Sequence, residues 1–173
     1  LATLTQNISF DVNDKEFLNE ITIENTSGFA WSDVRFSRGV DPDNTKFSVG
    51  GEYATTNSIA KTFAADGITV LQAQAQSADT SQVVVDSGTL VPMQYYTTDP
   101  GAFGVIAFGE DSDGFGGANP LSLIPGTKGD SVDADDAMQL VIAKGPLAIA
   151  ATVTTSYVTS LDVSVSGSSC LLY

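Results

Sequence analysis

The side chains in this sequence that are best suited to a functional site are clustered carboxylates. The chain contains 16 Asp against five Glu, and it has no His. The Asp gather in three short segments rich in turn residues, at 41–44, 110–114 and 130–136. Asp holds its carboxylate close to the backbone of a turn, which suits hard cations such as Ca²⁺. The clusters therefore predict calcium ligands among Asp41, Asp43, Asp111, Asp113, Asp130, Asp133, Asp135 and Asp136.

Most other site chemistry is excluded by composition. Without His there is no Ser/His/Asp or Cys/His triad and no imidazole zinc site, and the single Cys170 excludes thiolate metal centres. Only oxygen ligands remain, which means calcium or magnesium. Paired carboxylates can also hydrolyse glycosides, but Trp31 is the single Trp of the chain and gives little aromatic surface for binding a sugar. We therefore expect no enzymatic activity.

The net charge and the length of the chain limit which classes of protein it can belong to. The net charge is -14 with seven Lys plus Arg, which disfavours nucleic acid and anionic membrane as partners. The hydrophobic fraction of 42% predicts a packed core, and 173 residues suit a single domain spanning 1–173. No apolar run is long enough to predict a membrane span. Cys170 is expected to be an inert thiol, with an intermolecular disulfide as the alternative.

Period-2 alternation dominates the chain and predicts strands. The segments are rich in Val, Ile, Thr, Tyr and Phe and lie between Gly, Asp, Asn and Pro. They cover 17–23, 30–36, 68–73, 83–85, 105–108, 138–142 and 153–161. Short strands separated by frequent turn signals favour an all-β antiparallel β-sandwich over a parallel α/β sheet. We expect this sandwich to carry long acidic calcium-binding loops.

The longest predicted loop runs from Glu110 to Asp136. Loops of this length in compact domains are usually functional or ordered by something bound. Asp111-Ser112-Asp113-Gly114 has the opening of an EF-hand loop, but position 12 of that loop would be Ser122 instead of Glu. The EF-hand is therefore rejected. At 133–143, where acids precede an apolar run, we predict a loop entering a strand.

Several motifs in a fixed order resemble a known family. They are Asn25-Thr26-Ser27, Ser32-Asp33-Val34-Arg35-Phe36, Arg38-Gly39-Val40-Asp41-Pro42-Asp43, Tyr53-Ala54-Thr55-Thr56-Asn57, Thr98-Asp99-Pro100, Gly129-Asp130 and Asp133-Ala134-Asp135-Asp136-Ala137. This order is similar to that of calcium-dependent β-sandwich modules of bacterial surface proteins, including the peptide-binding domains of giant repeats-in-toxin adhesins. The resemblance implies a sandwich in which the first and third Asp clusters hold calcium beside a ligand groove. The family's Pro-Gly-Glu turn near the end is missing from 147–157.

These observations predict a non-enzymatic, extracellular, calcium-binding module for adhesion or surface assembly. Its expected partner is a peptide, protein or glycan on a cell surface, bound in a calcium-dependent way. The alternative is a structural subunit of a filament or surface layer, assembled from copies of itself by strand addition. The apolar segment Leu1 to Phe10 and the tail Cys170-Leu171-Leu172-Tyr173 suggest this alternative. A chain that begins at Leu1 also fits a processed, exported product.

Overall fold

The described part of the chain is all-β. The computed structural model describes residues 1–40, 55–62, 67, 69–75, 92–106, 119–134 and 137–161. These residues form strands without any helix, and every strand pair is antiparallel. The strands are β1 (Ala2–Ser9), β2 (Glu16–Asn25), β3 (Trp31–Val40), β4 (Thr55–Lys61), β5 (Thr69–Ala75), β6 (Pro92–Thr97), β7 (Ala102–Ile106), β8 (Ser131–Ala134), β9 (Met138–Leu147) and β10 (Thr152–Ser160). The predicted all-β antiparallel class is confirmed.

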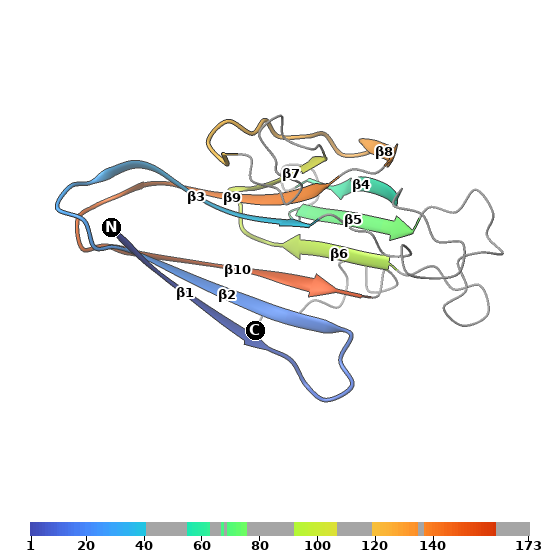
Figure 1. The fold of residues 1–173 in the computed structure, drawn as a ribbon, viewed down its shortest axis with the longest axis horizontal. Helices are drawn as coiled ribbons and strands as arrows, with labels where there is room; N and C mark the ends of the chain where they lie inside the picture. Colours follow the sequence, from blue (N-terminus) through green and yellow to red (C-terminus); the bar gives the residue numbers. More distant parts are fainter. Residues whose placement is uncertain are drawn as a thin grey trace.

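The strands form two sheets. The larger sheet has the order β1-β2-β10-β6-β5-β4-β8, and the smaller has the order β3-β9-β7. Figure 1 shows the two layers, with β3 and β9 above the long hairpin of β1 and β2. Three strands cannot cover seven, so part of the larger sheet has no strand of the smaller sheet over it. The order also shows that neighbours in space are often distant in sequence, as with β2 and β10.

The hydrophobic core lies between the two sheets. Alternation places Ile21 and Ile23 of β2 inward, and both are buried, while Glu20 before them and Glu24 after them are exposed. From the smaller sheet, Leu140 and Ile142 of β9 are fully buried against the same cluster. Each such side chain contributes about 1.5–3 kcal/mol through burial. Membership of both sheets in one cluster makes the arrangement a β-sandwich.

Tyrosines cross the interior of the sandwich. Tyr95 of β6 and Tyr157 of β10 are buried, and their rings meet edge to face at 5.8 Å with an interplanar angle of 84°. Phe36 of β3 approaches Tyr157 from the other sheet, with ring centroids 5.7 Å apart. These contacts join the sheets through aromatic packing. Tyr96, next to Tyr95 in β6, is also buried.

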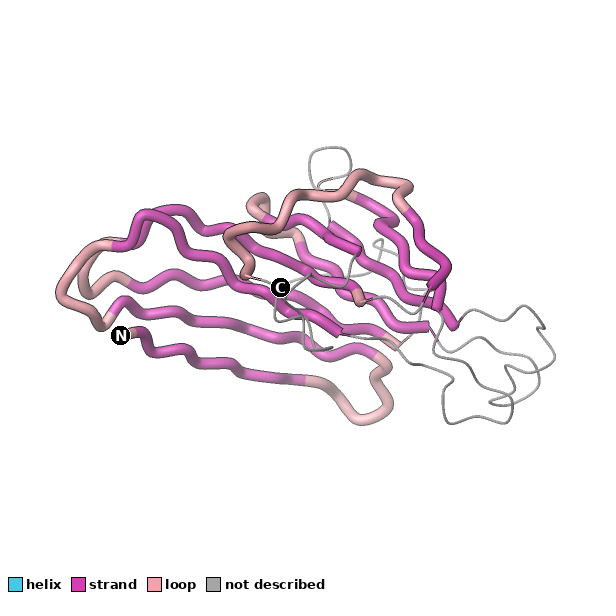
Figure 2. The backbone as a smooth tube through the Cα atoms, turned by 45° about the horizontal axis from the view of Figure 1, so that its top comes forward, coloured by secondary structure: helices cyan, strands magenta, loops and turns pink. Residues whose placement is uncertain are grey.

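Strand β1 forms one edge of the larger sheet. It pairs with β2 along its whole length, from Ala2 opposite Asn25 to Ser9 opposite Leu18, without a register shift. Every residue of β1 is nevertheless exposed to solvent. Figure 2 shows this hairpin running along the side of the molecule. Within the described ranges, no helix is long and apolar enough to cross a membrane.

Candidate functional site

Three strand ends meet in one row of the smaller sheet. Val40 at the end of β3 pairs with Met138 at the start of β9, and Met138 pairs on its other side with Ile106 at the end of β7. In sequence, Asp41 follows Val40 directly, Asp136 precedes Met138 by two residues, and Asp111 follows Ile106 by five. All three acidic segments are therefore joined to the fold at the same end of this sheet.

The larger sheet supplies a fourth strand end to this region. Ala134, the last residue of β8, pairs with Thr55 of β4 and is followed in sequence by Asp135 and Asp136. Only three residues separate Ala134 from Met138, and an extended chain advances at most about 3.6 Å per residue. The end of β8 must therefore lie close to the row formed by Val40, Met138 and Ile106. The third acidic segment links the two sheets.

Six of the eight predicted calcium ligands lie outside the described residues. They are Asp41, Asp43, Asp111, Asp113, Asp135 and Asp136. Asp133 lies in β8, opposite Thr56 of β4. The predicted loop entering a strand at 133–143 is confirmed for its strand, because β9 begins at Met138. It is wrong at 133–134, because these residues belong to β8 and continue the sheet beyond β4. A loop does run from 119 to 130, and it gives way to a strand at Ser131.

Asp130 is the one predicted ligand whose side chain is described, and it closes a turn. Its Oδ2 accepts a hydrogen bond of 2.7 Å from the backbone N–H of Thr127, and its own N–H donates to the Thr127 carbonyl at 2.9 Å. Gly129 precedes it with φ +94, a conformation that glycine adopts without strain. The Asp130 carbonyl accepts from Ile59 N–H at 2.9 Å, which fastens the turn to β4. One carboxylate oxygen is thus committed to local structure.

A hollow lies between this turn and the end of β7. It has a volume of about 390 Å³ and is lined mainly by apolar side chains, with Asp130 and Ser131 as polar members. Its lining includes Ile59, Val105, Ile106 and Ile124. Ile124 is 80% exposed, so an apolar group entering the hollow would cover surface that water now contacts. Ile106 belongs both to this lining and to the row where the acidic segments join.

A positively charged side chain, that of Arg38, lies near the same end of the smaller sheet. Arg38, three residues before Asp41 in sequence, hydrogen-bonds to Tyr95 across the sandwich. Burial raises the pKa of Tyr95 above its ordinary value, although the hydrogen bond with Arg38 opposes this shift. Burial also raises the pKa of Tyr157, again against the positive charge of Arg38. Both phenols therefore stay neutral, and Arg38 keeps its charge beside them.

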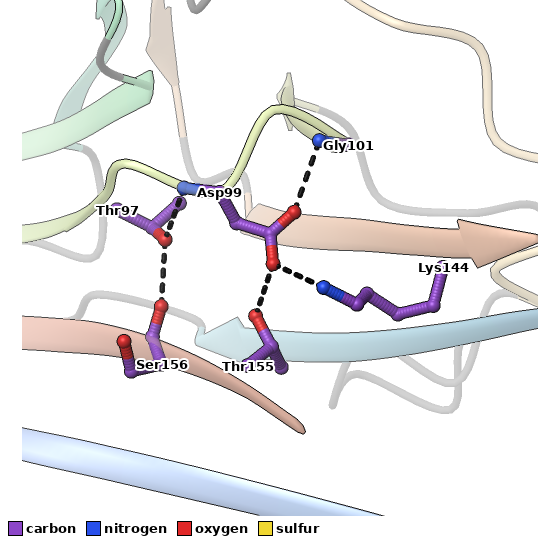
Figure 3. Close-up of polar contacts among 6 residues, drawn as sticks. All are labelled: Thr97, Asp99, Gly101, Lys144, Thr155 and Ser156. Carbon is purple, nitrogen blue, oxygen red and sulfur yellow. Dashed lines mark hydrogen bonds and ion pairs between the residues drawn. The ribbon is translucent and has the colours of Figure 1, made fainter. Parts of the chain in front are cut away.

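The most highly connected carboxylate in the described structure, that of Asp99, lies outside the three acidic clusters and was not among the predicted calcium ligands. Asp99 lies between β6 and β7, and its Oδ2 accepts hydrogen bonds of 2.7 Å from Lys144 of β9 and 2.7 Å from Thr155 of β10. Its Oδ1 accepts from Gly101 N–H at 3.0 Å. Thr97 extends the network, because its hydroxyl donates to the Ser156 carbonyl at 2.6 Å and accepts from Asp99 N–H (Figure 3).

This network joins the two sheets and engages both carboxylate oxygens of Asp99. The Asp99 side chain is 9% exposed and that of Lys144 20% exposed. Burial would raise the pKa of Asp99, but the hydrogen bonds from Lys144, Thr155 and Gly101 outweigh it, so the pKa lies below 3.8. A second hollow of about 380 Å³ borders Asp99, Glu20 and Asn7. The Asp99 network therefore stabilises the packing of the β6–β7 turn against β9 and β10.

The chain was compared with protein-family models, with curated proteins and with solved structures. No match was found in any of the three comparisons. The resemblance to calcium-dependent adhesin modules therefore stays a prediction from the motifs. Within the described side chains, no group of three or more His, Cys, Asp or Glu is arranged to hold a metal ion.

Proposed function

We propose that this chain is a non-enzymatic binding module that holds calcium at one end of a β-sandwich. The calcium orders the acidic segments, and the ordered end recognises a peptide or glycan partner in adhesion or surface assembly outside the cell. The proposal rests on one observation above all, the row formed by Val40, Met138 and Ile106. That row joins the three acidic segments to the same end of one sheet.

Electrostatics explains why this convergence calls for a cation. Segments 41–43, 111–113 and 135–136 contribute two Asp each, so six carboxylates are attached near one end of the sandwich. Like charges brought together repel unless a cation or solvent screens them, and the repulsion grows where protein replaces water. In the described part of this region, Arg38 is held by Tyr95. A divalent cation would remove the repulsion and add coordination bonds.

The donor set fits calcium by its chemistry. Ca²⁺ takes about six to eight oxygen ligands, drawn from carboxylates, backbone carbonyls and water. The acidic segments supply Asp carboxylates and, through their Pro, Gly and Ser content, turns whose carbonyls can also face an ion. Soft ligands are scarce, because the chain has no His and one Cys. A bound ion would supply charge compensation and order, without a role in covalent chemistry.

The partner would bind where the apolar hollow meets the acidic end. Ile106 and Ile124 offer apolar surface there, and Asp130 offers a carboxylate at the rim. A groove of this composition suits a short peptide with one apolar and one polar or basic group. A binding role is also favoured over catalysis because the described carboxylates of Asp99 and Asp130 are engaged in structural hydrogen bonds.

Thermal unfolding with and without calcium tests the proposal. The chain is stripped with a chelator, and its melting temperature is measured in excess EGTA and in about 2 mM free Ca²⁺. Binding to the folded state alone should raise the melting temperature by several degrees, because ligation stabilises by RT ln(1 + [L]/Kd). Magnesium at the same concentration should have a smaller effect, since it dehydrates reluctantly.

Matched variants separate a specific site from general charge screening. Asp41→Asn and Asp135→Asn remove one charge each from the proposed site, whereas Asp11→Asn removes one charge from an exposed position far from it in sequence. The first two should reduce the calcium-dependent rise and the third should leave it intact. Equal behaviour of all three, or identical melting curves in calcium and EGTA, would overturn the proposal.

A further inference from the structure

In the part of the chain that the structure describes, the outer edge of β1 lacks the common protections against pairing with another strand. Sheet edges in monomeric proteins are usually short, charged, bulged, interrupted by Pro or covered. β1 has eight residues, keeps a continuous register with β2 and contains neither Pro nor a charged residue. Within the described chain, β2 is its only strand partner. The backbone groups of β1 that face away from β2 therefore form a long, neutral edge without a bulge.

The other sheet edges of the described fold carry such protections. β8, at the far side of the larger sheet, has four residues and includes Asp133. β3 has register shifts between Trp31 and Arg35 and contains three charged residues, Asp33, Arg35 and Arg38. β7 is five residues long, and Gly126 N–H donates to its Gly104 carbonyl at 2.9 Å. The contrast singles out β1 as the edge open to a partner.

The charge distribution indicates which partner can approach. A chain with net charge -14 repels its own copies over most of its surface, yet residues 1–10 carry no charged side chain. The apolar side chains of this segment are well exposed: Leu4 by 56%, Ile8 by 55% and Phe10 by 71%. Two copies can therefore meet at this strip with little repulsion, and meeting there would remove apolar surface from water.

The sequence of β1 is also self-complementary when it pairs with itself. Leu4 lies opposite Ile23 of β2, so the even-numbered residues of β1 share the face that leads into the core. In an antiparallel pair centred on Gln6, Leu4 of one copy lies opposite Ile8 of the second copy, and Ala2 opposite Phe10. Every apolar residue of that face then gains an apolar cross-strand neighbour, and on the other face Thr5 lies opposite Asn7.

We propose that two copies of this chain associate through antiparallel pairing of their β1 strands about a two-fold axis at Gln6. The two larger sheets then form one continuous sheet across the dimer. Such an interface is closed, because each β1 edge is used once and the β8 edges remain apart. The dimer depends on backbone pairing and apolar contact in β1 and does not require calcium at the acidic end.

Charge exchange at Leu4 and Ile8 tests both the interface and its register. Mass is measured by multi-angle light scattering over about 1–500 µM in 0.15 M salt and EGTA. The native chain should shift from 18.0 kDa to twice that mass. Leu4→Glu with Ile8→Glu places like charges opposite each other twice and should weaken dimerisation by about 100-fold or more. Leu4→Lys with Ile8→Glu places opposite charges there and should restore the dimer.

Controls keep the result interpretable. Both positions are more than half exposed, so the variants should keep the native circular dichroism spectrum and cooperative melting. Leu121→Glu, at an apolar position of similar exposure (54%), should leave the dimer intact. Higher salt should strengthen the native dimer by screening the acidic surfaces. A native chain that stays monomeric at 500 µM, open-ended assemblies, or failure of the Lys/Glu pair to restore dimers would each overturn the proposal.

Discussion

The Nζ atom of Lys144 lies 2.7 Å from Oδ2 of Asp99, which ties the β6–β7 turn to the central strand of the smaller sheet. Both side chains are largely buried, so removal of Lys144 leaves a carboxylate short of one charged partner. We expect Lys144→Met and Asp99→Asn each to cost about 2–4 kcal/mol of unfolding free energy. The double variant should cost less than the sum, and urea denaturation of all four proteins measures this coupling. If the costs of the two single variants simply add up in the double variant, Lys144 and Asp99 do not stabilise each other.

The same carboxylate should make stability depend on pH in acid. The pKa of Asp99 is lower in the folded chain than its ordinary value of 3.8, so folding favours the ionised form. The stabilisation is complete above the unfolded pKa and is lost as pH falls through the folded pKa. The difference in unfolding free energy between the native chain and Asp99→Asn should therefore be constant from pH 7 to about 5 and shrink below about pH 4. A difference that widens in acid would refute this assignment.

At the end of the sandwich opposite the acidic segments, Asn25 is expected to be the polar residue whose substitution lowers stability most. It is fully buried, and its Nδ2 lies 2.9 Å from the Phe29 carbonyl and 3.1 Å from that of Ala148, while its Oδ1 accepts from Ser27. It thus fastens the β2–β3 turn to the β9–β10 turn. Asn25→Ala should cost about 2–4 kcal/mol, because it leaves several buried backbone groups without partners.

Asn25→Asp should be worse than Asn25→Ala in the same denaturation assay. The carboxylate would face carbonyl oxygens where the amide now donates, and burial of an unpaired charge is costly. Thr154→Ala, on an exposed position of β10 outside the proposed dimer interface, provides the control and should change stability by less than about 0.5 kcal/mol. If Asn25→Ala matches this control, the Asn25 contacts do not stabilise the fold.

Gly101 is required because two backbones approach too closely for a side chain. A Cβ at this position would overlap the carbonyl oxygen of Ala143, whose N–H donates to the Gly101 carbonyl at 2.9 Å. We expect Gly101→Ala to lower the melting temperature clearly, with a cost of about 1–3 kcal/mol. Gly28→Ala is the matched control, since a Cβ there meets nothing within 4 Å. Similar melting temperatures for the two variants would contradict the close approach.

Strands with a strong hydrophobic signal could be predicted from sequence. The segments 17–23, 138–142 and 153–161 overlap β2, β9 and β10. In β2 the buried Ile21 and Ile23 alternate with more exposed residues, whereas residues 138–142 of β9 are all buried and were marked by their apolar composition. The motif Thr98-Asp99-Pro100 lies between β6 and β7. Segment 83–85 lies outside the described residues.

Strands without a strong hydrophobic signal could not be predicted. β6 carries Tyr95 and Tyr96 side by side, and both are buried, so no period of two marks it. β4 contains the buried Asn57 among Thr and Ser, which gives no hydrophobic signal. The short β8 is stabilised by its pairing with β4, a tertiary contact that local propensity does not contain.

The acidic clusters were visible in the sequence, but their convergence was not. Residue type and turn chemistry suffice to suggest calcium, and they apply to each cluster separately. Whether the clusters meet depends on the pairing of Val40 with Met138 and of Met138 with Ile106, which joins strands far apart in the chain. The bonds of Asp99 to Lys144 and Thr155 were missed for the same reason, because the partners come from β9 and β10.

Calorimetric titration of Ca²⁺ into the chelator-stripped chain tests the central claim most directly. We expect saturable binding with at least one site and a Kd between about 10⁻⁶ and 10⁻³ M, the range of calcium sensors and extracellular modules. Asp135→Asn should weaken the binding by about tenfold or more, and Asp11→Asn should leave it unchanged. Absence of saturable binding up to several millimolar Ca²⁺, or equal affinity in Asp135→Asn and the native chain, would contradict a calcium site at the end of the sandwich where β3, β7 and β9 meet.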